Sequence, residues 1–243
     1  IVIFMLLAGT NFTLIYFALK MKFHKILKND EFKWYLSSII SVILLLTLLL
    51  SLNNNISFLN AFRKVSFQVV SIITTTGYAT ADYTTWGYFM SFIFFLFLFS
   101  GGSAGSTSGG IKIVRIIIII KNGLLEFKRR LHPKAVIPVM LNGSAISNQI
   151  IYNLLAFIFL YLFIFTVGSI LLTALGVDFL TSISAVASAV GNVGPGIAQV
   201  GPSYSFDHIP LLGKWILSLL MLMGRLELFT VCLIFTPYFW KRI

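Results

Sequence analysis

The stretch Thr74-Thr75-Thr76-Gly77-Tyr78-Ala79-Thr80 decides how the rest of the chain is organised. This polar, glycine-centred run directly follows the apolar segment 66–73 and lies between two apolar segments of membrane length. Backbone that leaves a helix loses its hydrogen-bond partners. At membrane depth this is tolerated only where the chain lines a wet cavity or is buried in protein. The run is therefore the first candidate site.

Composition indicates a polytopic membrane protein. Hydrophobic residues make up 58% of the chain, charged residues only 10%, and the mean hydropathy is +0.96, far from the values of soluble domains. The formal charge of +11 does not indicate nucleic-acid binding, because the Lys and Arg residues cluster in short loops between apolar runs, as orientation in a bilayer requires. The single cysteine, Cys232, excludes a disulfide framework and a cysteine metal site.

The first half of the chain alternates apolar segments with polar or charged loops. Residues 1–19 lack a charged start and a cleavage site, so we expect a transmembrane helix that is cut at its beginning, not a signal peptide. The lysine-rich loop 20–33 predicts a cytoplasmic location. Residues 34–52 are long enough to span the bilayer. Residues 56–73 carry Arg63 and Lys64 and are better interpreted as a re-entrant half-helix.

The next apolar segment is interrupted near its middle. Residues 88–100 stop about halfway across a bilayer, a Gly/Ser run occupies 101–110, and residues 111–120 resume the apolar character. Glycine weakens the helix and hydroxyl groups compete for its hydrogen bonds. We therefore expect a broken helix, followed by a basic cytoplasmic loop at 121–134.

The second half repeats this order. Residues 135–149 predict an interfacial segment, and 150–176 a span. A short helix over 178–190, capped by Asp178, leads into a second glycine-rich run, Gly191-Asn192-Val193-Gly194-Pro195-Gly196. The final span, 211–235, ends in the basic 240–243 and so in the cytoplasm.

Aligning Gly77 with Gly194 places Ser71 against Ser188, Thr75 against Asn192 and Thr76 against Val193. Two copies at equivalent depth favour one shared site. A half-helix followed by an extended glycine-containing strand is how a pore presents backbone carbonyls to a dehydrated cation, and the helix end adds partial negative charge. The predicted fold is all-α, with membrane-pore-membrane repeats, re-entrant pore helices and one broken transmembrane helix.

The two runs, the broken span at 101–110 and Gly224-Arg225-Leu226-Glu227 in the last span carry a resemblance. Together they resemble the Trk/Ktr/HKT superfamily of potassium uptake proteins, most closely its TrkH membrane subunits. The resemblance implies four repeats around one pore. Here residues 1–33 would be the end of a preceding repeat and a cytoplasmic loop, 34–134 the third repeat and 135–243 the fourth.

The resemblance also implies the residues of a K⁺ filter. Carbonyl oxygens of Thr75, Thr76, Asn192 and Val193 would coordinate K⁺, with Gly77 and Gly194 permitting the backbone shape. The complete predicted filter is Thr75, Thr76, Gly77, Tyr78, Asn192, Val193, Gly194 and Pro195.

An intramembrane gating loop is the second implied element. It would comprise Gly101, Gly102, Ser103, Ala104, Gly105, Ser106, Thr107, Ser108, Gly109 and Gly110, and a passive kink is the alternative. By resemblance Arg225 would be an electrostatic barrier in the cavity below the filter. Its alternative is a structural ion pair with Glu227, although residues two apart do not share a helix face. Lys112 and Arg115 are expected to snorkel toward the cytoplasmic interface.

The family implies partners beyond the bilayer: a second copy of the complete subunit and a cytosolic, nucleotide-binding TrkA-like ring that would dock on basic loops such as 121–134. We expect no covalently bound cofactor, K⁺ as the transported ion, and nucleotide only through that separate regulatory subunit. The expected location is the cytoplasmic membrane.

The sequence is compatible with two other functions. A symporter that couples K⁺ to H⁺ or Na⁺ also uses broken helices, although Glu227 is the only acidic residue in a predicted span. A remote alternative is an intramembrane serine hydrolase, because residues 101–105 match the G-x-S-x-G pattern around Ser103. That chemistry requires a base, and the three histidines, His24, His132 and His208, all lie in predicted loops.

Overall fold

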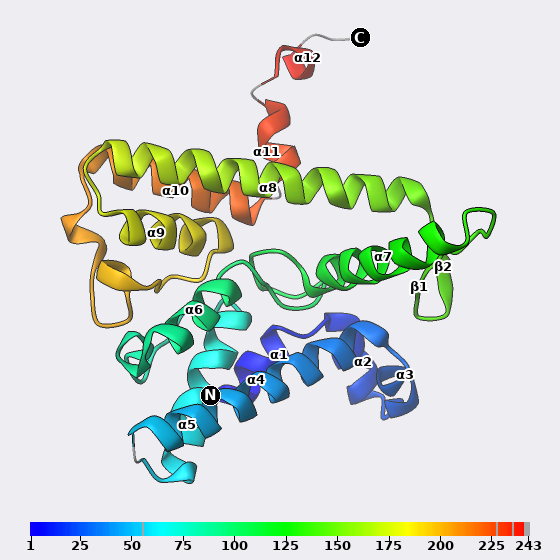
Figure 1. Cartoon of the computed structure of the whole chain (residues 1–243), viewed down its shortest axis with the longest axis horizontal. Coiled ribbons are helices and arrows are strands. Elements are labelled where there is room, and N and C mark those ends of the chain that lie inside the picture. The colour runs from blue at the N-terminus through cyan, green and yellow to red at the C-terminus, as the bar shows by residue number, and fades with distance from the viewer. Residues whose placement is uncertain (55, 227, 235, 241–243) are drawn as a thin grey trace.

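The computed structural model describes residues 1–54, 56–226, 228–234 and 236–240 (Figure 1). As predicted, the regular elements in these residues are helices, and the exception is one short hairpin. The α-helices are α1 (Val2–Ala8), α2 (Phe12–Leu19), α3 (Phe23–Leu27), α4 (Asp30–Asn54), α5 (Phe58–Ile73), α6 (Tyr88–Phe97), α7 (Ile113–Leu131), α8 (Asn148–Ala174), α9 (Phe179–Gly191), α10 (Leu211–Arg225), α11 (Leu228–Ile234) and α12 (Pro237–Trp240). Short 3-10 helices are η1 (Tyr83–Trp86), η2 (Ala198–Val200) and η3 (Phe206–His208), and the strands are β1 (Val139–Leu141) and β2 (Ser144–Ile146).

Two helices, α4 and α8, are long and apolar enough to cross a membrane, and they match the predicted spans 34–52 and 150–176. The helices that follow them are much shorter. Helix α5 has 16 residues and α9 has 13, fewer than the ~20 that a spanning helix needs. The predicted cap of α9 is confirmed, because the Asp178 carboxylate accepts from the Thr181 N–H at 3.2 Å.

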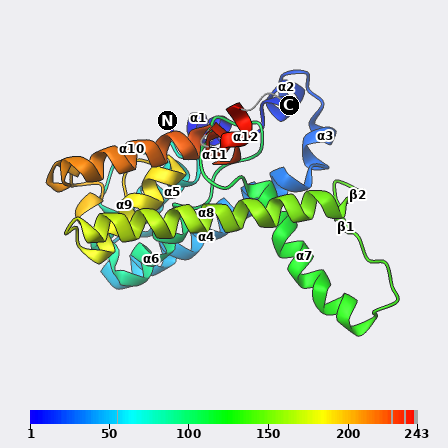
Figure 2. The ribbon, with the colours of Figure 1, turned by 90° about the horizontal axis from the view of Figure 1, so that it is seen from above.

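The helices form two packed groups (Figure 1). Helix α5 packs against α4 and α1, and α9 packs between α8 and α10. Each group has its own buried apolar core, around Leu46 and Val69 in the first and around Leu172 and Val186 in the second. Helices α6 and α7 connect the groups, and α7 extends away from both, as the view from above shows (Figure 2).

The predicted break in the span 88–120 is present. Helix α6 ends at Phe97 and α7 begins at Ile113. Between them Ser100 and Ile111 pair as a single parallel bridge, which closes the intervening residues into a loop.

Two predicted spans are not single helices. Residues 1–19 form α1 and α2, which meet at 115°. At this break the Thr10 hydroxyl donates to the Leu6 carbonyl at 2.8 Å, and the Asn11 side chain caps α2 by accepting from the Thr13 N–H at 2.8 Å, so local side-chain bonds end one helix and begin the next. Likewise, 211–235 divides into α10 and α11, and Glu227 and residues 241–243 lie outside the described residues.

The interfacial segment expected at 135–149 contains a β-hairpin. Val139 pairs with Ile146 and Leu141 with Ser144 around Asn142-Gly143, a dipeptide typical of two-residue hairpin turns. The turn is attached to the start of α4, because the Asp30 N–H donates to the Asn142 side chain at 2.7 Å and the Asn142 N–H donates to the Asp30 carboxylate at 2.9 Å.

Helix α10 approaches the end of α9 so closely that Gly224 has no room for a side chain. A Cβ at Gly224 would lie 2.0 Å from the Val190 carbonyl oxygen, whereas a Cβ at Gly123 of α7 would meet nothing within 4 Å. We therefore expect Gly224→Ala to lower the unfolding temperature of the complete natural protein in detergent, through overpacking that costs about 1–3 kcal/mol. Gly123→Ala is the matched helical control and should not lower it. Equal unfolding temperatures for the two variants would contradict this packing.

Candidate functional site

The first polar run leaves the end of α5 with its N–H groups directed back into the helix. The Thr75 N–H donates to the Ile72 carbonyl at 3.0 Å, and the Thr76 and Gly77 N–H groups both donate to the Ser71 carbonyl, at 2.9 and 3.4 Å. Thr75 has φ 53° and Gly77 has φ 80°. The Ser71 hydroxyl then donates to the Tyr78 carbonyl at 2.6 Å and holds the run against its own helix.

The second run leaves α9 in the same conformation. The Val193 N–H donates to the Ser188 carbonyl at 3.0 Å, as Thr76 does to Ser71. Asn192 has φ 55° and Gly194 has φ 110°. The Ser188 hydroxyl donates to the Gly194 carbonyl at 2.6 Å and accepts from the Gly194 N–H at 3.1 Å. The residue pairs aligned from the sequence therefore share one backbone geometry.

This geometry fixes the direction of four carbonyl groups. In a planar trans peptide the C=O and the following N–H point in opposite directions, so an N–H that returns to the helix end directs the preceding C=O away from it. The rule applies to the carbonyls of Thr75, Thr76, Asn192 and Val193. Within the described part of the chain no hydrogen bond reaches these four oxygens, although such groups normally find a partner.

The two runs contact each other at their glycines. A Cβ at Gly77 would lie 2.2 Å from the Val193 carbonyl oxygen and 3.4 Å from the Pro195 side chain. The nearest atom to a Cβ at Gly194 is the Gly77 Cα, at 3.9 Å. The predicted filter residues of the two runs are thus brought together, while the Tyr78 side chain is 66% exposed and its carbonyl accepts from the Ser71 hydroxyl.

The loop 101–110 is held together by its own hydroxyl groups. The Gly102 N–H donates to the Ser108 hydroxyl at 2.8 Å, and the Ser106 hydroxyl lies 2.8 Å from that of Ser108 and donates to the Ser103 carbonyl at 2.6 Å. A Cβ at Gly101 would lie 1.9 Å from the Gly109 carbonyl oxygen. The loop is therefore a compact folded unit.

Gly109 connects this loop to both polar runs. Its N–H donates to the Thr75 hydroxyl at 2.7 Å. A Cβ at Gly109 would lie 2.5 Å from the Gly191 carbonyl oxygen and 2.9 Å from the Asn192 Cβ. The loop thus lies directly against the residues that end α5 and α9.

The middle of the loop is fastened to the first helices and to the start of α4. The Ser103 N–H donates to the Gly9 carbonyl at 2.9 Å, and the Thr107 N–H donates to the Ala8 carbonyl at 3.3 Å, both at the break between α1 and α2. The Ala104 N–H donates to the Glu31 carboxylate at 2.6 Å. Glu31 is only 6% exposed, so the loop supplies the partner for a buried carboxylate.

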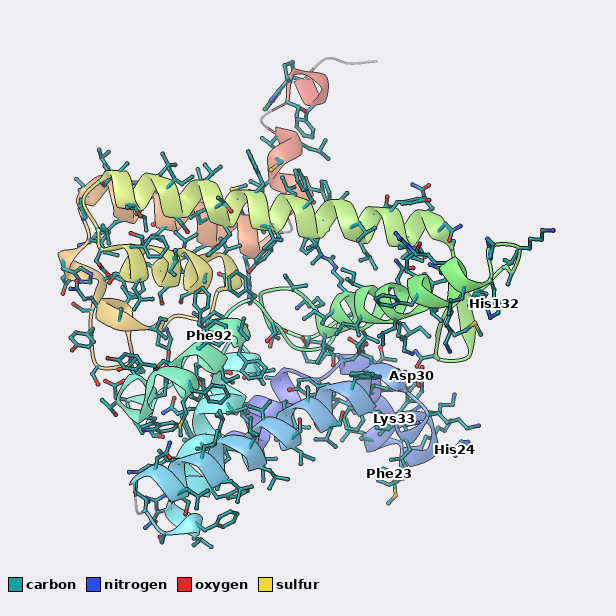
Figure 3. All side chains as sticks on the ribbon, in the orientation of Figure 1. Phe23, His24, Asp30, Lys33, Phe92 and His132 are labelled. Carbon is teal, nitrogen blue, oxygen red and sulfur yellow. The ribbon has the colours of Figure 1, made fainter. Side chains whose placement is uncertain are left out.

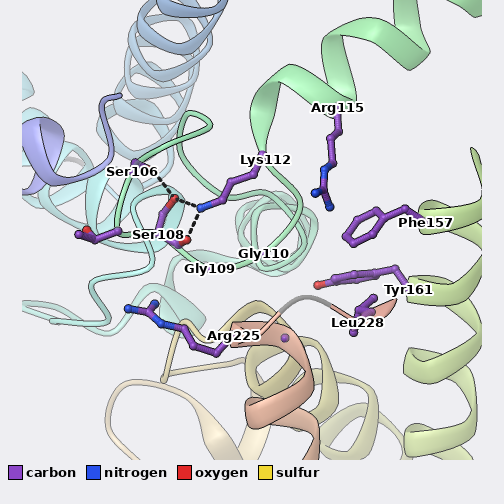
Figure 4. Close-up of a pocket in the computed structure, with 12 residues that line it drawn as sticks. Ser106, Ser108, Gly109, Gly110, Lys112, Arg115, Phe157, Tyr161, Arg225 and Leu228 are labelled. Atoms are coloured by element: carbon purple, nitrogen blue, oxygen red, sulfur yellow. Dashed lines mark hydrogen bonds between the residues drawn. The ribbon is translucent and has the colours of Figure 1, made fainter. Parts of the chain in front are cut away.

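A cavity of about 290 Å³ adjoins the loop, and three basic side chains line it (Figure 4). The Lys112 ammonium contacts the Ser108 carbonyl and lies 3.2 Å from the Ser108 hydroxyl. The Arg115 guanidinium stacks over the Phe157 ring, 3.9 Å from its centroid, which is the geometry of a cation–π contact. Arg225 lines the cavity from the end of α10.

The cavity brings together the basic residues that the sequence singled out. Lys112 and Arg115 both line it with Arg225, and their snorkelling toward the cytoplasmic interface stays a prediction. Their position directly after the Gly/Ser run was the available signal, since a charge beside a broken helix tends to face the protein interior. The Glu31 contact had no sequence signal, because 73 residues separate it from Ala104. Glu227 lies outside the described residues.

The serine-hydrolase alternative finds no catalytic arrangement. Ser103 is fully buried, and its hydroxyl has no hydrogen-bond partner among the described residues. His24 and His132 lie at the outer edge of the molecule, on α3 and at the end of α7 (Figure 3), and the His208 ring bonds the Ser205 carbonyl. A serine hydrolase needs a base within reach of its nucleophile, and the positions of these three histidines do not provide one for Ser103.

Long apolar helices, two matched glycine-centred runs and a loop packed against them define a polytopic membrane protein of the ion-transport class. Comparison with known proteins is more specific. The family model described as TrkH, cation transport protein, matches residues 1–242. The chain belongs to this TrkH family.

Several relatives are similar to this chain over nearly its whole length. The Trk system potassium uptake protein TrkH of Escherichia coli (strain K12) is 35% identical over 244 residues, which cover 100% of this chain and 50% of that protein. TrkG of the same organism is 33% identical over 240 residues, covering 98% and 49%. The crystal structure of the potassium transporter TrkH from Vibrio parahaemolyticus superimposes with a TM-score of 0.91 at 35% identity, covering 99% of this chain and 52% of that chain. This chain therefore spans about half the length of the relatives it matches.

The Glu31 contact predicts how firmly the loop is held. Replacing Glu31 with Ala removes the acceptor of the Ala104 N–H, so we expect faster amide hydrogen exchange across residues 101–110 in the complete protein, by about tenfold for the loss of one hydrogen bond to a charged group. Glu126→Ala is the control, because Glu126 forms exposed ion pairs on α7 with Arg129 and Arg130. Exchange in 101–110 that is the same in both variants would contradict the anchoring role of Glu31.

Proposed function

We propose that this chain forms part of a potassium uptake protein, in which the carbonyl oxygens of Thr75, Thr76, Asn192 and Val193 coordinate K⁺. The observation that carries the proposal is the direction of these four groups, which point away from their helix ends and receive no hydrogen bond from the described residues. Carbonyl oxygens so arranged can replace the hydration shell of a cation. The C-terminal ends of α5 and α9 add partial negative charge.

Potassium is the proposed ion because the relatives at 35% identity are named potassium uptake proteins or potassium transporters. The two runs supply only part of the ring of oxygen atoms that would coordinate the ion. We assign residues 34–134 and 135–243 to the third and fourth of four repeats, so that strands from the remainder of the complete protein close the ring around the ion. Helices α5 and α9 are then re-entrant pore helices.

The loop 101–110 is the proposed gate. Gly109 borders the two runs on one side and the cavity on the other. A cation that leaves the runs toward the cavity therefore meets the loop first. Moving the loop breaks the bond between Gly109 and Thr75 and the contact between Lys112 and Ser108, while glycine-rich backbone accepts a second conformation at small cost. Arg225, at the cavity wall, is the proposed electrostatic barrier.

The proposed assembly is a homodimer of the complete subunit in the cytoplasmic membrane, with its C-terminal end in the cytoplasm. Basic residues of α7 and its following loop, including Lys128 and Arg130, are exposed and offer a docking surface for a TrkA-like nucleotide-binding ring. Nucleotide would then act on the gate only through that separate protein.

Ion flux tests the function directly. The complete natural protein in liposomes, with K⁺ as the sole permeant cation, should pass K⁺ and should prefer it over Na⁺ when both are present. Flux that requires a Na⁺ or H⁺ gradient would replace the channel-like mechanism with coupled symport. Absence of cation flux under every condition would overturn the proposal.

Substitutions of the two glycines, one in each run, are expected to lower K⁺ selectivity to different extents. Gly77→Ala should abolish the preference for K⁺, because its Cβ would lie 2.2 Å from the Val193 carbonyl oxygen as well as straining φ 80°. Gly194→Ala should have a smaller effect, because φ 110° is strained but the nearest atom is 3.9 Å away. The measurement is the ratio of K⁺ to Na⁺ uptake.

The control for backbone strain alone is Gly87→Ala. Gly87 has φ 115°, and a Cβ there meets nothing within 4 Å, so the variant carries a similar cost of about 1–2 kcal/mol away from the runs. Its K⁺/Na⁺ ratio should equal that of the wild type. An unchanged ratio in a folded Gly77→Ala protein would remove the filter assignment.

A further inference from the structure

A buried tyrosine joins the two repeats beside the polar runs. Tyr83, in η1 just beyond the first run, is fully buried, and its hydroxyl donates to the Gly196 carbonyl at 2.6 Å. Gly196 belongs to the second run, 113 residues further along the chain. The ring of Tyr83 is fixed by Phe94 of α6, with centroids 4.5 Å apart.

Gly196 is the point where the second run turns away from the site. It lies two residues beyond Gly194, and its N–H donates to the Val200 carbonyl at 2.7 Å. The next N–H, that of Ile197, donates to the Ser184 hydroxyl at 2.5 Å. These two bonds fasten the outer end of the run within its own repeat, whereas the bond from Tyr83 fastens it to the preceding repeat.

The contact between repeats is tight on both sides of this bond. Deeper in the site Gly77 lies against the Val193 carbonyl. Further out, a Cβ at Gly201 would lie 3.0 Å from the Thr84 side chain. The Tyr83 hydroxyl therefore lies inside a packed contact, where a hydrogen bond is not replaced by bulk water when it is lost. Burial, with a smaller contribution from Asp82, raises the pKa of Tyr83, so the hydroxyl keeps the proton that it donates.

We infer that Tyr83 is a positioning residue for ion selectivity, which holds the outer end of the second run so that its carbonyls cannot close around an ion smaller than K⁺. The inference rests on the proposed function. Na⁺ requires shorter oxygen distances than K⁺, and discrimination by carbonyls depends on how freely the strand that carries them can contract. With the hydroxyl removed, the run gains freedom at Gly196 and accommodates Na⁺ more readily.

The test is Tyr83→Phe in the complete natural protein, which removes one oxygen atom and keeps the ring against Phe94. We expect the ratio of K⁺ to Na⁺ flux in liposomes to fall about threefold to tenfold, the range that corresponds to losing one hydrogen bond. The loss should come from faster Na⁺ flux, with K⁺ flux unchanged. If the variant is not recovered from membranes, Tyr83→Met, which keeps apolar bulk without the hydroxyl, carries the same expectation.

The matched control is Tyr35→Phe. Tyr35 is also buried, and its hydroxyl donates to the Leu6 carbonyl at 3.3 Å. This bond joins α4 to α1 and does not involve either run. Both variants should lower the unfolding temperature slightly, but only Tyr83→Phe should change the flux ratio.

Two results would overturn the inference in distinguishable ways. A ratio that is unchanged in Tyr83→Phe, in an assay where Gly77→Ala loses selectivity, leaves the filter in place and reduces Tyr83 to a structural residue. A wild-type protein without any preference for K⁺ removes the filter and the role of Tyr83 with it.

Discussion

The arrangement of the site depends on where six N–H groups are directed. Those of residues 75–77 and 192–194 all return to the ends of α5 and α9, mainly to the Ser71 carbonyl and to the carbonyl and hydroxyl of Ser188. Because the peptide is planar, the carbonyls between them face the other way. The short helices therefore have two effects: they satisfy the donors of an irregular backbone, and they leave its acceptors without a hydrogen bond on the opposite side.

Close backbone approach is the second constraint, and it explains the small residues around the site. Gly77 lies against Val193, Gly109 against Gly191, and Gly224 against Val190, each contact being made to a carbonyl oxygen. A side chain at any of these glycines would push apart elements from different parts of the chain. The same contacts make the loop 101–110 sensitive to the runs, since Gly109 bonds Thr75 directly. The two runs and a loop that is held by a few hydroxyl hydrogen bonds therefore border each other.

The sequence predicted the helices and the break between them because their signals are local. Hydropathy located α4 and α8, the Gly/Ser run located the break before α7, and glycine spacing paired Thr75 with Asn192, which share the left-handed conformation. Hydropathy predicted helix boundaries poorly where local side-chain hydrogen bonds end a helix within an apolar segment. Residues 1–19 are predominantly apolar, yet Asn11 caps a second helix at their middle. The Asn142-Gly143 turn carried a hairpin signal that the polar, proline-containing context of 135–149 obscured.

The contacts between distant segments could not be predicted at all, and they are the ones that make the site a single unit. Two hydrogen bonds join residues that are 73 or more positions apart, Glu31 with Ala104 and Tyr83 with Gly196. The sequence around one residue of each pair does not indicate its partner. Glu31 holds the loop from the side of α4, where Asp30 is bound to the hairpin turn, and Tyr83 holds the second run from η1. Asp30 and Glu31 thus connect the hairpin turn to the loop through two adjacent carboxylates, whereas the bond from Tyr83 reaches the second run without passing through the loop.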